Sequence, residues 1–207
     1  MAAIVPFPGG DATLGIVAGG KARRLSGLAK GLLVYQGRTF LERLLDLRPL
    51  FAEVLLGTND AAPYARFGLG TVADAIVDRG APGGVHALLA AARTPWLLAV
   101  AADMPFVAQA AVEALLAARS DGADAVCFEV SGRLQPLLAV YRAEIARAWG
   151  EALAAGPSFG KLLSRFQTTV LPERALALVD PSLRSVEGVN TRLEAERWGV
   201  AFACDVP

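Results

Sequence analysis

Residues 14–33 read L-G-I-V-A-G-G-K-A-R-R-L-S-G-L-A-K-G-L-L, a short apolar strand that opens into a loop rich in glycine and in cations. The strand is Leu14–Val17, and the loop holds Gly19, Gly20, Gly27, Lys21, Arg23, Arg24 and Lys30. Glycine lets a backbone adopt positive φ and approach a ligand closely, and cations beside exposed backbone N–H groups favour a polyphosphate. The spacing fits neither a P-loop nor a dinucleotide fingerprint. The loop therefore indicates nucleotide chemistry of another kind, with a glycine-rich turn carrying solvated cations as the alternative.

Strand-like runs alternate with helix-like runs along the rest of the chain. The predicted strands are Leu14–Val17, Glu53–Gly57, Trp96–Ala102, Ala123–Phe128 and Pro136–Tyr141. The predicted helices are Thr39–Leu50, Gly84–Arg93, Ala108–Arg119, Arg142–Ala155, Ser158–Phe166 and Thr191–Gly199. Such alternation predicts a Rossmann-like, three-layer α/β/α fold with a mostly parallel central sheet. We expect a single domain over residues 1–207, in which residues 1–11, rich in Pro and Gly, are partly disordered.

The carboxyl ends of the predicted strands mark the place where a ligand would bind. In open α/β sheets, ligands lie in the crevice beyond these ends, which points to the segments after Val17, Gly57, Ala102 and Tyr141. The glycine loop follows the first of these strands and Asp103 follows the third. A carboxylate at that position is a candidate Mg²⁺ ligand, because Mg²⁺ prefers hard oxygen ligands. The alternative for Asp103 is a helix cap or a partner for an arginine.

Composition excludes several classes of protein. Twenty Lys and Arg balance twenty Asp and Glu, which gives no support for a nucleic-acid footprint. No run reaches the roughly 18 apolar residues that a membrane span needs, and no signal peptide is visible. One histidine, His86, and two distant cysteines, Cys127 and Cys204, supply neither a zinc site nor a disulfide framework. We expect a cytoplasmic protein with no membrane or nucleic-acid partner.

Local signals predict where three of the helices begin. Thr39 with Glu42 and Thr191 with Glu194 have capping-box spacing, and Ser158 is a predicted N-cap. Asn190 precedes the second capping box. Its position fits either a role in helix capping or a contact to a substrate.

Several motifs in the same order resemble the molybdenum cofactor guanylyltransferase family. The segment A-G-G-K-A-R-R-L-S-G-L-A-K (residues 18–30) resembles the family's signature loop, and Ala101-Ala-Asp103-Met-Pro105 resembles its metal-binding strand end. Asp74-Ala-Ile-Val-Asp78 with Gly80-Ala-Pro-Gly-Gly84 resembles its acidic and Gly-Pro loop. Gln135–Tyr141 resembles the strand beside the second substrate, and Val189-Asn190-Thr191 resembles the late Asn-Thr motif. The resemblance covers most of the chain.

The resemblance implies Mg²⁺-dependent transfer of GMP from GTP to molybdopterin, with release of pyrophosphate. It implies Arg24, Lys30 and Asp103 as catalytic residues, and Asp103 as the metal ligand. The implied nucleotide contacts are Val17, Ala18, Gly19, Gly20, Lys30, Asp74 and Asp103, and Asn190 is an implied acceptor contact. The expected partners are GTP, a molybdopterin-type cofactor and the apoenzymes that receive the product. A carboxylate such as Asp74 can accept hydrogen bonds from guanine N1–H and the N2 amino group, whereas Asp78 is interpreted as a turn residue.

Four departures from the family pattern keep other functions open. Leu25-Ser26 stands where Met-Gly is usual, Ala29 where Asp is frequent, and Gly57 and Gly188 where Asn is frequent, although Asn59 could substitute for the first Asn. Ala18-Gly19-Gly20 resembles the guanylyltransferases, whereas Ala-Ala-Gly resembles the sister cytidylyltransferases. The alternatives are CMP transfer from CTP to the same cofactor, GMP transfer to another phosphorylated acceptor, and a non-catalytic protein that binds nucleotide or cofactor.

Overall fold

The computed structural model describes residues 10–19, 29–76 and 78–201. The strands are β1 (Ala12–Val17), β2 (Val34–Tyr35), β3 (Arg38–Thr39), β4 (Glu53–Gly57), β5 (Gly70–Val72), β6 (Trp96–Ala101), β7 (Ala125–Val130), β8 (Arg133–Arg142), β9 (Thr168–Pro172) and β10 (Val200–Ala201). The α-helices are α1 (Phe40–Leu44), α2 (Gly80–Ala91), α3 (Gln109–Ala117), α4 (Ala146–Leu153), α5 (Phe159–Leu163), α6 (Glu173–Val179) and α7 (Arg192–Trp198). Short 3₁₀ helices are η2 (Lys30–Leu32), η3 (Leu45–Leu50), η4 (Ala62–Phe67), η5 (Ala143–Ile145) and η6 (Arg184–Val186).

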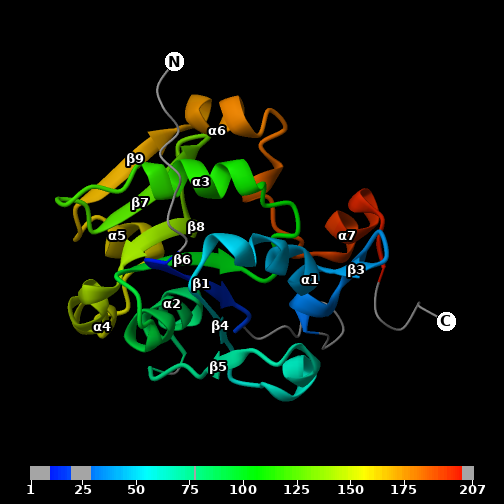
Figure 1. Cartoon of the computed structure of the whole chain (residues 1–207), viewed down its shortest axis with the longest axis horizontal. Helices are drawn as coiled ribbons and strands as arrows, with labels where there is room; N and C mark the ends of the chain where they lie inside the picture. The colour runs from blue at the N-terminus through cyan, green and yellow to red at the C-terminus, as the bar shows by residue number, and fades with distance from the viewer. Residues whose placement is uncertain (1–9, 20–28, 77, 202–207) are drawn as a thin grey trace.

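A seven-stranded sheet in the order β5-β4-β1-β6-β8-β7-β9 forms the centre of the molecule. Helices α2, α4 and α5 cover one of its faces, and α1, α3 and α6 cover the other (Figure 1). The prediction of a three-layer α/β fold with a mostly parallel sheet is confirmed, because among these strands only β8 runs against its neighbours in the described parts of the chain.

The central strands are apolar on both faces because helices cover both faces. In β6, Leu98 and Val100 belong to the core beneath α1 and α3, whereas Leu97 and Ala99 belong to the core beneath α2 and α4. All six residues of β6 are buried. A strand covered on both sides reads as a continuous apolar run, which is the pattern that predicted this strand from the sequence.

The direction of β8 corrects one prediction about the ligand edge. Val100 at the carboxyl end of β6 pairs with Leu138, and Trp96 at its start pairs with Arg142, so β8 is antiparallel to β6. The segment after Tyr141 therefore lies at the opposite edge from the ends of β1, β4 and β6. The reason is the tight turn at Ser131 and Gly132, both at positive φ, which joins β7 to β8 as a hairpin without a crossover helix.

Several elements and boundaries also differ from the prediction. Thr39–Leu50 is not one helix: α1 ends at Leu44 and continues as the 3₁₀ turns of η3, which contain Pro49. The strands β5 and β9 were not predicted, because both are short and half-exposed and so lack an apolar run. The helix expected from Gly84 begins at Gly80 instead. Pro82 lies in the first turn of this helix. Proline is tolerated there, because backbone N–H groups of the first turn have no carbonyl partner within the helix.

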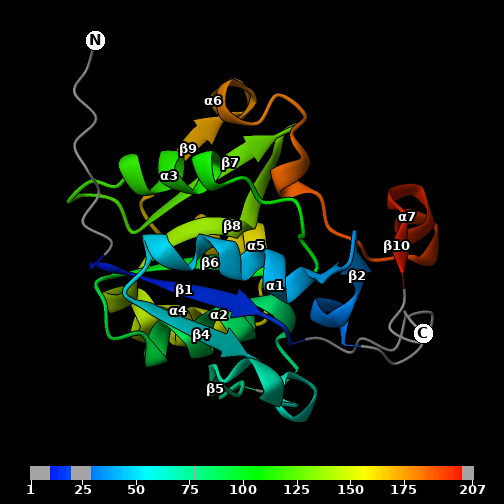
Figure 2. The ribbon, with the colours of Figure 1, turned by 45° about the vertical axis from the view of Figure 1, so that its right-hand side comes forward.

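A second, three-stranded sheet pairs the C-terminal end of the described chain with the hairpin of residues 34–39. Its order is β10-β2-β3, and it lies with α7 beyond the carboxyl ends of β1 and β4 (Figure 2). Buried Leu33, Phe40, Val189, Ala195 and Val200 form its core. No helix in the described residues is long and apolar enough to span a membrane.

Candidate active site

A cavity of about 260 Å³ lies at the carboxyl edge of the sheet. Its walls come from the end of β1, the turn η2, the first turn of α2, the end of β6, β8 and the segment before α7. The lining residues are Val17, Ala18, Gly19, Lys30, Ala81, Ala101, Ala102, Asp103, Leu137 and Asn190. Six residues predicted from the sequence therefore share one cavity: Val17, Ala18, Gly19, Lys30, Asp103 and Asn190.

Lys30 joins the two other polar side chains of this cavity. Its Nζ donates to Asp103 Oδ2 at 2.7 Å and to Asn190 Oδ1 at 2.5 Å. The side chains of Lys30 and Asp103 are only 26% and 15% exposed. The ammonium group thus lies between a carboxylate and an amide in the wall of the cavity, partly shielded from solvent, where its attraction for an added anion is stronger than in bulk water.

Backbone hydrogen bonds help to fix the positions of Asp103 and Asn190 beside Lys30. Asp103 follows β6 directly, and its carbonyl oxygen accepts a hydrogen bond from the Val189 N–H at 2.9 Å. Both parts of the Thr191–Glu194 capping box are present, as the sequence predicts. Glu194 Oε2 also accepts from the Asn190 N–H at 2.7 Å. That hydrogen bond is the largest of the contacts that lower the pKa of Glu194, so the cap is charged at neutral pH and fixes the backbone of Asn190.

The first turn of α2 packs tightly against β1, which explains its glycines. A Cβ on Gly84 would lie 3.0 Å from Val17 Cγ1, and one on Gly83 would lie 3.0 Å from Arg79 Cβ. Gly83 and Gly84 have no side chain that would obstruct this packing. They let the helix approach the strand, which places Ala81 and the N–H groups of the first turn at the cavity.

Asp74 is held beside the cavity by Asn59. Asn59 Nδ2 donates to Asp74 Oδ2 at 3.0 Å, and the Asp74 N–H donates to Asn59 Oδ1 at 2.8 Å. The other carboxylate oxygen, Oδ1, is buried and accepts no hydrogen bond within the described part of the chain. A Cβ on Gly19 would lie 3.8 Å from Asp74 Oδ2, so the carboxylate faces the glycine segment without lining the cavity itself.

Two departures from the family pattern have a steric explanation. A Cβ on Gly57 would lie 3.2 Å from the Leu88 side chain, so a larger residue would crowd that side chain of α2. Asn59 therefore supplies the amide from two residues further along. A Cβ on Gly188 would lie 3.1 Å from Asn190 Nδ2 and 3.3 Å from Asp103 Oδ1. Glycine at this position leaves the Asp103 carboxylate accessible.

The side chains of this cavity suit a metal ion that takes most of its ligands from a bound substrate. Within the described ranges no group of three His, Cys, Asp or Glu residues could hold a metal by itself. Asp103 Oδ2 binds Lys30, whereas Oδ1 accepts no hydrogen bond from a described residue. Mg²⁺ in phosphoryl-transfer sites commonly takes one or two carboxylates, with water and phosphate oxygens as the remaining ligands. One accessible carboxylate oxygen beside a lysine fits that pattern.

Some predicted residues remain untested and some lining residues were missed. Arg24 and Gly20 lie outside the described residues. Ala81 and Leu137 line the cavity without any chemical signal in the sequence, since a helix start and a strand residue bring them there. The sequence suggested Asn59 only as a substitute for the asparagine that the family has at position 57. It gave no sign that Asn59 orients the Asp74 carboxylate.

Known proteins resemble this chain over most of its length. The model of the MobA-like NTP transferase domain matches residues 15–168. A molybdenum cofactor guanylyltransferase from Desulfosudis oleivorans is 29% identical over 195 residues, which cover 93% of this chain and 96% of the relative. A "probable molybdenum cofactor guanylyltransferase" from Chloroflexus aggregans is 37% identical over 186 residues, or 85% of this chain and 88% of the relative.

A solved structure of a similarly named protein has a similar fold. Molybdopterin-guanine dinucleotide biosynthesis protein A from Archaeoglobus fulgidus superposes with a TM-score of 0.77 at 25% identity, over 89% of this chain and 95% of that protein. The range matched by the domain model contains Val17, Lys30, Asp74 and Asp103.

Proposed function

The chain belongs to the molybdenum cofactor guanylyltransferase family of MobA-like nucleotidyltransferases, and on that premise we propose that it transfers GMP from GTP to molybdopterin. The acceptor's terminal phosphate oxygen forms a bond to the α-phosphorus of GTP. The bond from that phosphorus to the bridging oxygen of the β-phosphate breaks, and pyrophosphate leaves. A phosphate acceptor is already ionised at neutral pH, so the reaction needs stabilisation of charge more than a general base.

The observation that carries the proposal is the contact of Lys30 with Asp103 and Asn190 inside the cavity. Lys30 supplies positive charge for the triphosphate, and Asn190 orients the lysine and contacts the acceptor. The N–H groups of Ala18 and Gly19 and of the first turn of α2 are donors for phosphate oxygens. Arg24 is proposed as a second cation from the glycine loop, and Gly20 as a further close backbone contact.

Mg²⁺ is the proposed metal, with Asp103 as its protein ligand. When bound it would neutralise charge on the phosphates and on the leaving pyrophosphate. Asp103 is suited to this role because Oδ2 accepts a hydrogen bond from Lys30, whereas Oδ1 lies beside Gly188, which has no side chain to cover it. The departures at Gly57 and Gly188 therefore give no support to a non-catalytic protein, since Lys30 and Asp103 still meet.

Asp74 is proposed to select guanine. Its buried Oδ1 is an acceptor with no partner among described residues, and a buried acceptor of that kind is unfavourable unless a ligand supplies a donor. Guanine offers N1–H and the N2 amino group on one edge, a pattern that adenine and cytosine lack. Asn59 holds the other oxygen and thereby fixes which oxygen faces the ligand.

Nucleotide-dependent thermal stability followed by a turnover assay tests the proposed function. The melting temperature would be measured with GTP, CTP and ATP, each with and without Mg²⁺. At a ligand concentration 100 times its dissociation constant, about 2.7 kcal/mol of stabilisation is expected, which raises the melting temperature of a protein of this size by about 5–10 °C. GTP alone should give this shift in Mg²⁺, and pyrophosphate release should then require molybdopterin. A shift with CTP would support the cytidylyl alternative, and binding without turnover would support a binding protein.

Exchange of Asp74 for Asn should weaken GTP binding while preserving the fold. The new amide oxygen can keep the hydrogen bond from Asn59, so the amide nitrogen would take the place of Oδ1 and oppose the guanine donors. Loss of a hydrogen bond between a charged and a neutral group is worth about 1.5–3 kcal/mol, or about 10- to 100-fold in dissociation constant. Calorimetric titration with GTP measures the effect, and Asp78→Asn, at a turn residue with φ of 59°, is the matched control. Equal GTP affinity in the two variants would reject the contact.

A further inference from the structure

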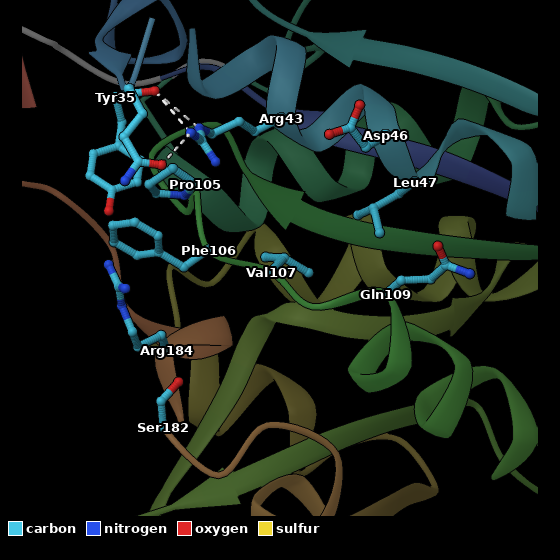
Figure 3. A pocket seen from close by; sticks show the side chains of 11 residues that line it. Tyr35, Arg43, Asp46, Leu47, Pro105, Phe106, Val107, Gln109, Ser182 and Arg184 are labelled. Atoms are coloured by element: carbon cyan, nitrogen blue, oxygen red, sulfur yellow. Dashed lines mark hydrogen bonds between the residues drawn. The ribbon is translucent and has the colours of Figure 1, made fainter. Parts of the chain in front are cut away.

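Outside the active-site cavity, aromatic rings and a guanidinium group form a continuous stack. Tyr35 and Phe106 meet edge to face, with ring centroids 5.3 Å apart, and Phe106 and Trp198 are 5.4 Å apart. The Arg184 guanidinium lies over both Phe106 and Trp198, with Cζ 3.6 Å and 4.1 Å from the two ring centroids. Figure 3 shows Tyr35, Phe106 and Arg184 along one side of a separate cavity of about 420 Å³. We name the four residues Tyr35, Phe106, Arg184 and Trp198 the aromatic stack.

Each ring of the aromatic stack belongs to a segment that carries one residue of the active site. Tyr35 is in β2, which follows the η2 turn that begins at Lys30. Phe106 is three residues after Asp103, in the loop between β6 and α3. Trp198 ends α7, the helix whose N-terminal cap follows Asn190. The three segments that meet at the Lys30 ammonium group on one side therefore meet again in the aromatic stack.

Arg184 lies in η6, six residues before Asn190 in the chain. Its Nε and Nη2 atoms are buried and have no hydrogen-bond partner in the described part of the chain. The guanidinium thus binds its neighbours through its faces, by cation–π attraction. Buried donors without acceptors are unfavourable, so the sandwich between two rings must contribute enough to hold the side chain in place.

The turn that carries Arg184 is itself firmly anchored. Asp180 Oδ2 accepts hydrogen bonds from the N–H and the Oγ of Ser185, each at 2.7 Å. The Oγ of Ser185 in turn accepts from the Ala108 N–H at 3.0 Å, immediately before α3. Because Asp180 and Ser185 are both buried, η6 offers a rigid base. At the other end of the stack, Arg43 donates to the Tyr35 carbonyl at 2.9 Å and lies over the Tyr35 ring.

We propose that Arg184 and Phe106 are positioning residues, which hold the Asp103 loop, the Lys30 segment and α7 in the arrangement that brings Lys30 onto Asp103 and Asn190. Neither residue lines the active-site cavity, so neither is catalytic. At the polar cluster the three segments are joined by two hydrogen bonds, and the Val189–Asp103 backbone hydrogen bond and the core of the second sheet add further contacts. The aromatic stack joins the Asp103 loop, the Lys30 segment and α7 at one more point and so restricts their relative rotation.

The test compares Arg184→Met with Arg197→Met. Methionine keeps the length and apolar character of the side chain but has no charge and no planar face. Arg197 also lies over Trp198, at 5.0 Å, but it is exposed on α7 and no contact of its own to Phe106 is present among the described residues. Arg184→Lys retains the charge without the planar group. Phe106→Leu removes the aromatic ring that the loop between β6 and α3 contributes to the stack.

The first readout does not depend on the proposed function. The chain has three lysines, Lys21, Lys30 and Lys161, so limited acylation followed by peptide mass spectrometry reports each one separately. Lys161 is exposed on α5 and serves as the internal reference. Loss of a cation–π contact should raise the acylation rate of Lys30 relative to Lys161 by about 2- to 20-fold in Arg184→Met and Phe106→Leu, and less in Arg184→Lys. The Arg197→Met ratio should equal that of the wild type.

The second readout is kinetic and rests on the proposed function. In Arg184→Met we expect kcat for GMP transfer to fall by about 3- to 30-fold, and by a larger factor than the KM for GTP rises, because Asp74, the proposed guanine contact, follows β5 and belongs to none of the segments that the aromatic stack joins. All variants would be assayed well below their melting temperatures. Unchanged Lys30 acylation in both Arg184→Met and Phe106→Leu would overturn the positioning role. If the wild type transfers no nucleotide while the acylation ratio still rises, the proposed function fails and the positioning role stands.

Discussion

Exchange of Asp103 for Asn should lower the rate of nucleotidyl transfer by about 10²- to 10³-fold, while the protein stays folded. The amide keeps the size of the carboxylate and can still accept the Lys30 hydrogen bond that Oδ2 accepts in the wild type. It removes the negative charge that a divalent cation requires of its protein ligand. Pyrophosphate release at saturating GTP and molybdopterin, measured across a Mg²⁺ titration, would show a loss of kcat that added Mg²⁺ does not restore.

Asp121→Asn is the matched control for this variant. Asp121 is an exposed acid in the loop between α3 and β7, and the hydrogen bond it accepts from Arg142 goes to its backbone carbonyl, so the exchange leaves that contact intact. Asp121→Asn should melt within about 2 °C of the wild type, as surface exchanges usually change stability by less than about 0.5 kcal/mol. Asp103→Asn should remain folded at the assay temperature, which its own melting curve checks. A fully active Asp103→Asn protein would remove Asp103 from the catalytic assignment.

Truncation of Trp149 to Ala should cause a large loss of stability, about 3–5 kcal/mol. Trp149, a residue of α4, is fully buried in the core between this helix and the sheet. It stacks on Phe166 with centroids 5.4 Å apart and meets Tyr141 edge to face at 5.3 Å. Truncation would leave a cavity among these rings. Chemical denaturation should show a lower midpoint, and the melting temperature should fall by about 10 °C.

Two control variants separate packing from polarity at Trp149. Its Nε1 donates to the Pro82 carbonyl at 3.1 Å, which joins α4 to the first turn of α2 beside the active-site cavity. Trp149→Phe retains most of the ring volume but loses this hydrogen bond, so it should lose less stability than Trp149→Ala. Leu178→Ala on α6, where the side chain is 84% exposed, should change stability by less than about 0.5 kcal/mol. A Trp149→Ala protein as stable as Leu178→Ala would show that the aromatic cluster contributes little.

Short-range patterns of the sequence were sufficient for much of the fold. The buried run of β6 and the exact ends of β4 follow from apolar side chains that helices cover on both faces. The capping boxes at Thr39 and Thr191 and the cap at Ser158 form as predicted. The capping signals join residues three positions apart and the strand signals are contiguous runs, so each depends only on local geometry.

Local signals fail where the outcome depends on a distant partner. The start of α2 at Gly80 depends on close packing against Val17, and a single sequence does not reveal that packing. The half-exposed edge strand β9 depends on pairing with β7, which supplies hydrogen bonds that its own side chains do not predict. The direction of β8 depends on the hairpin at Ser131 and Gly132, although its apolar run would suit a parallel strand equally well.

The sequence by itself determined the chemical types at the active site and their attachment to strand ends: a glycine loop after β1, Lys30, and an acid at Asp103. Tertiary structure alone decided that Lys30 meets Asn190, a residue 160 positions away, that Asn59 orients Asp74, and that Arg184 lies between Phe106 and Trp198. The physical reason is that strand propensity and capping act within a few residues, whereas these contacts require the sheet order and the pairing of β10 with β2 to bring remote segments together.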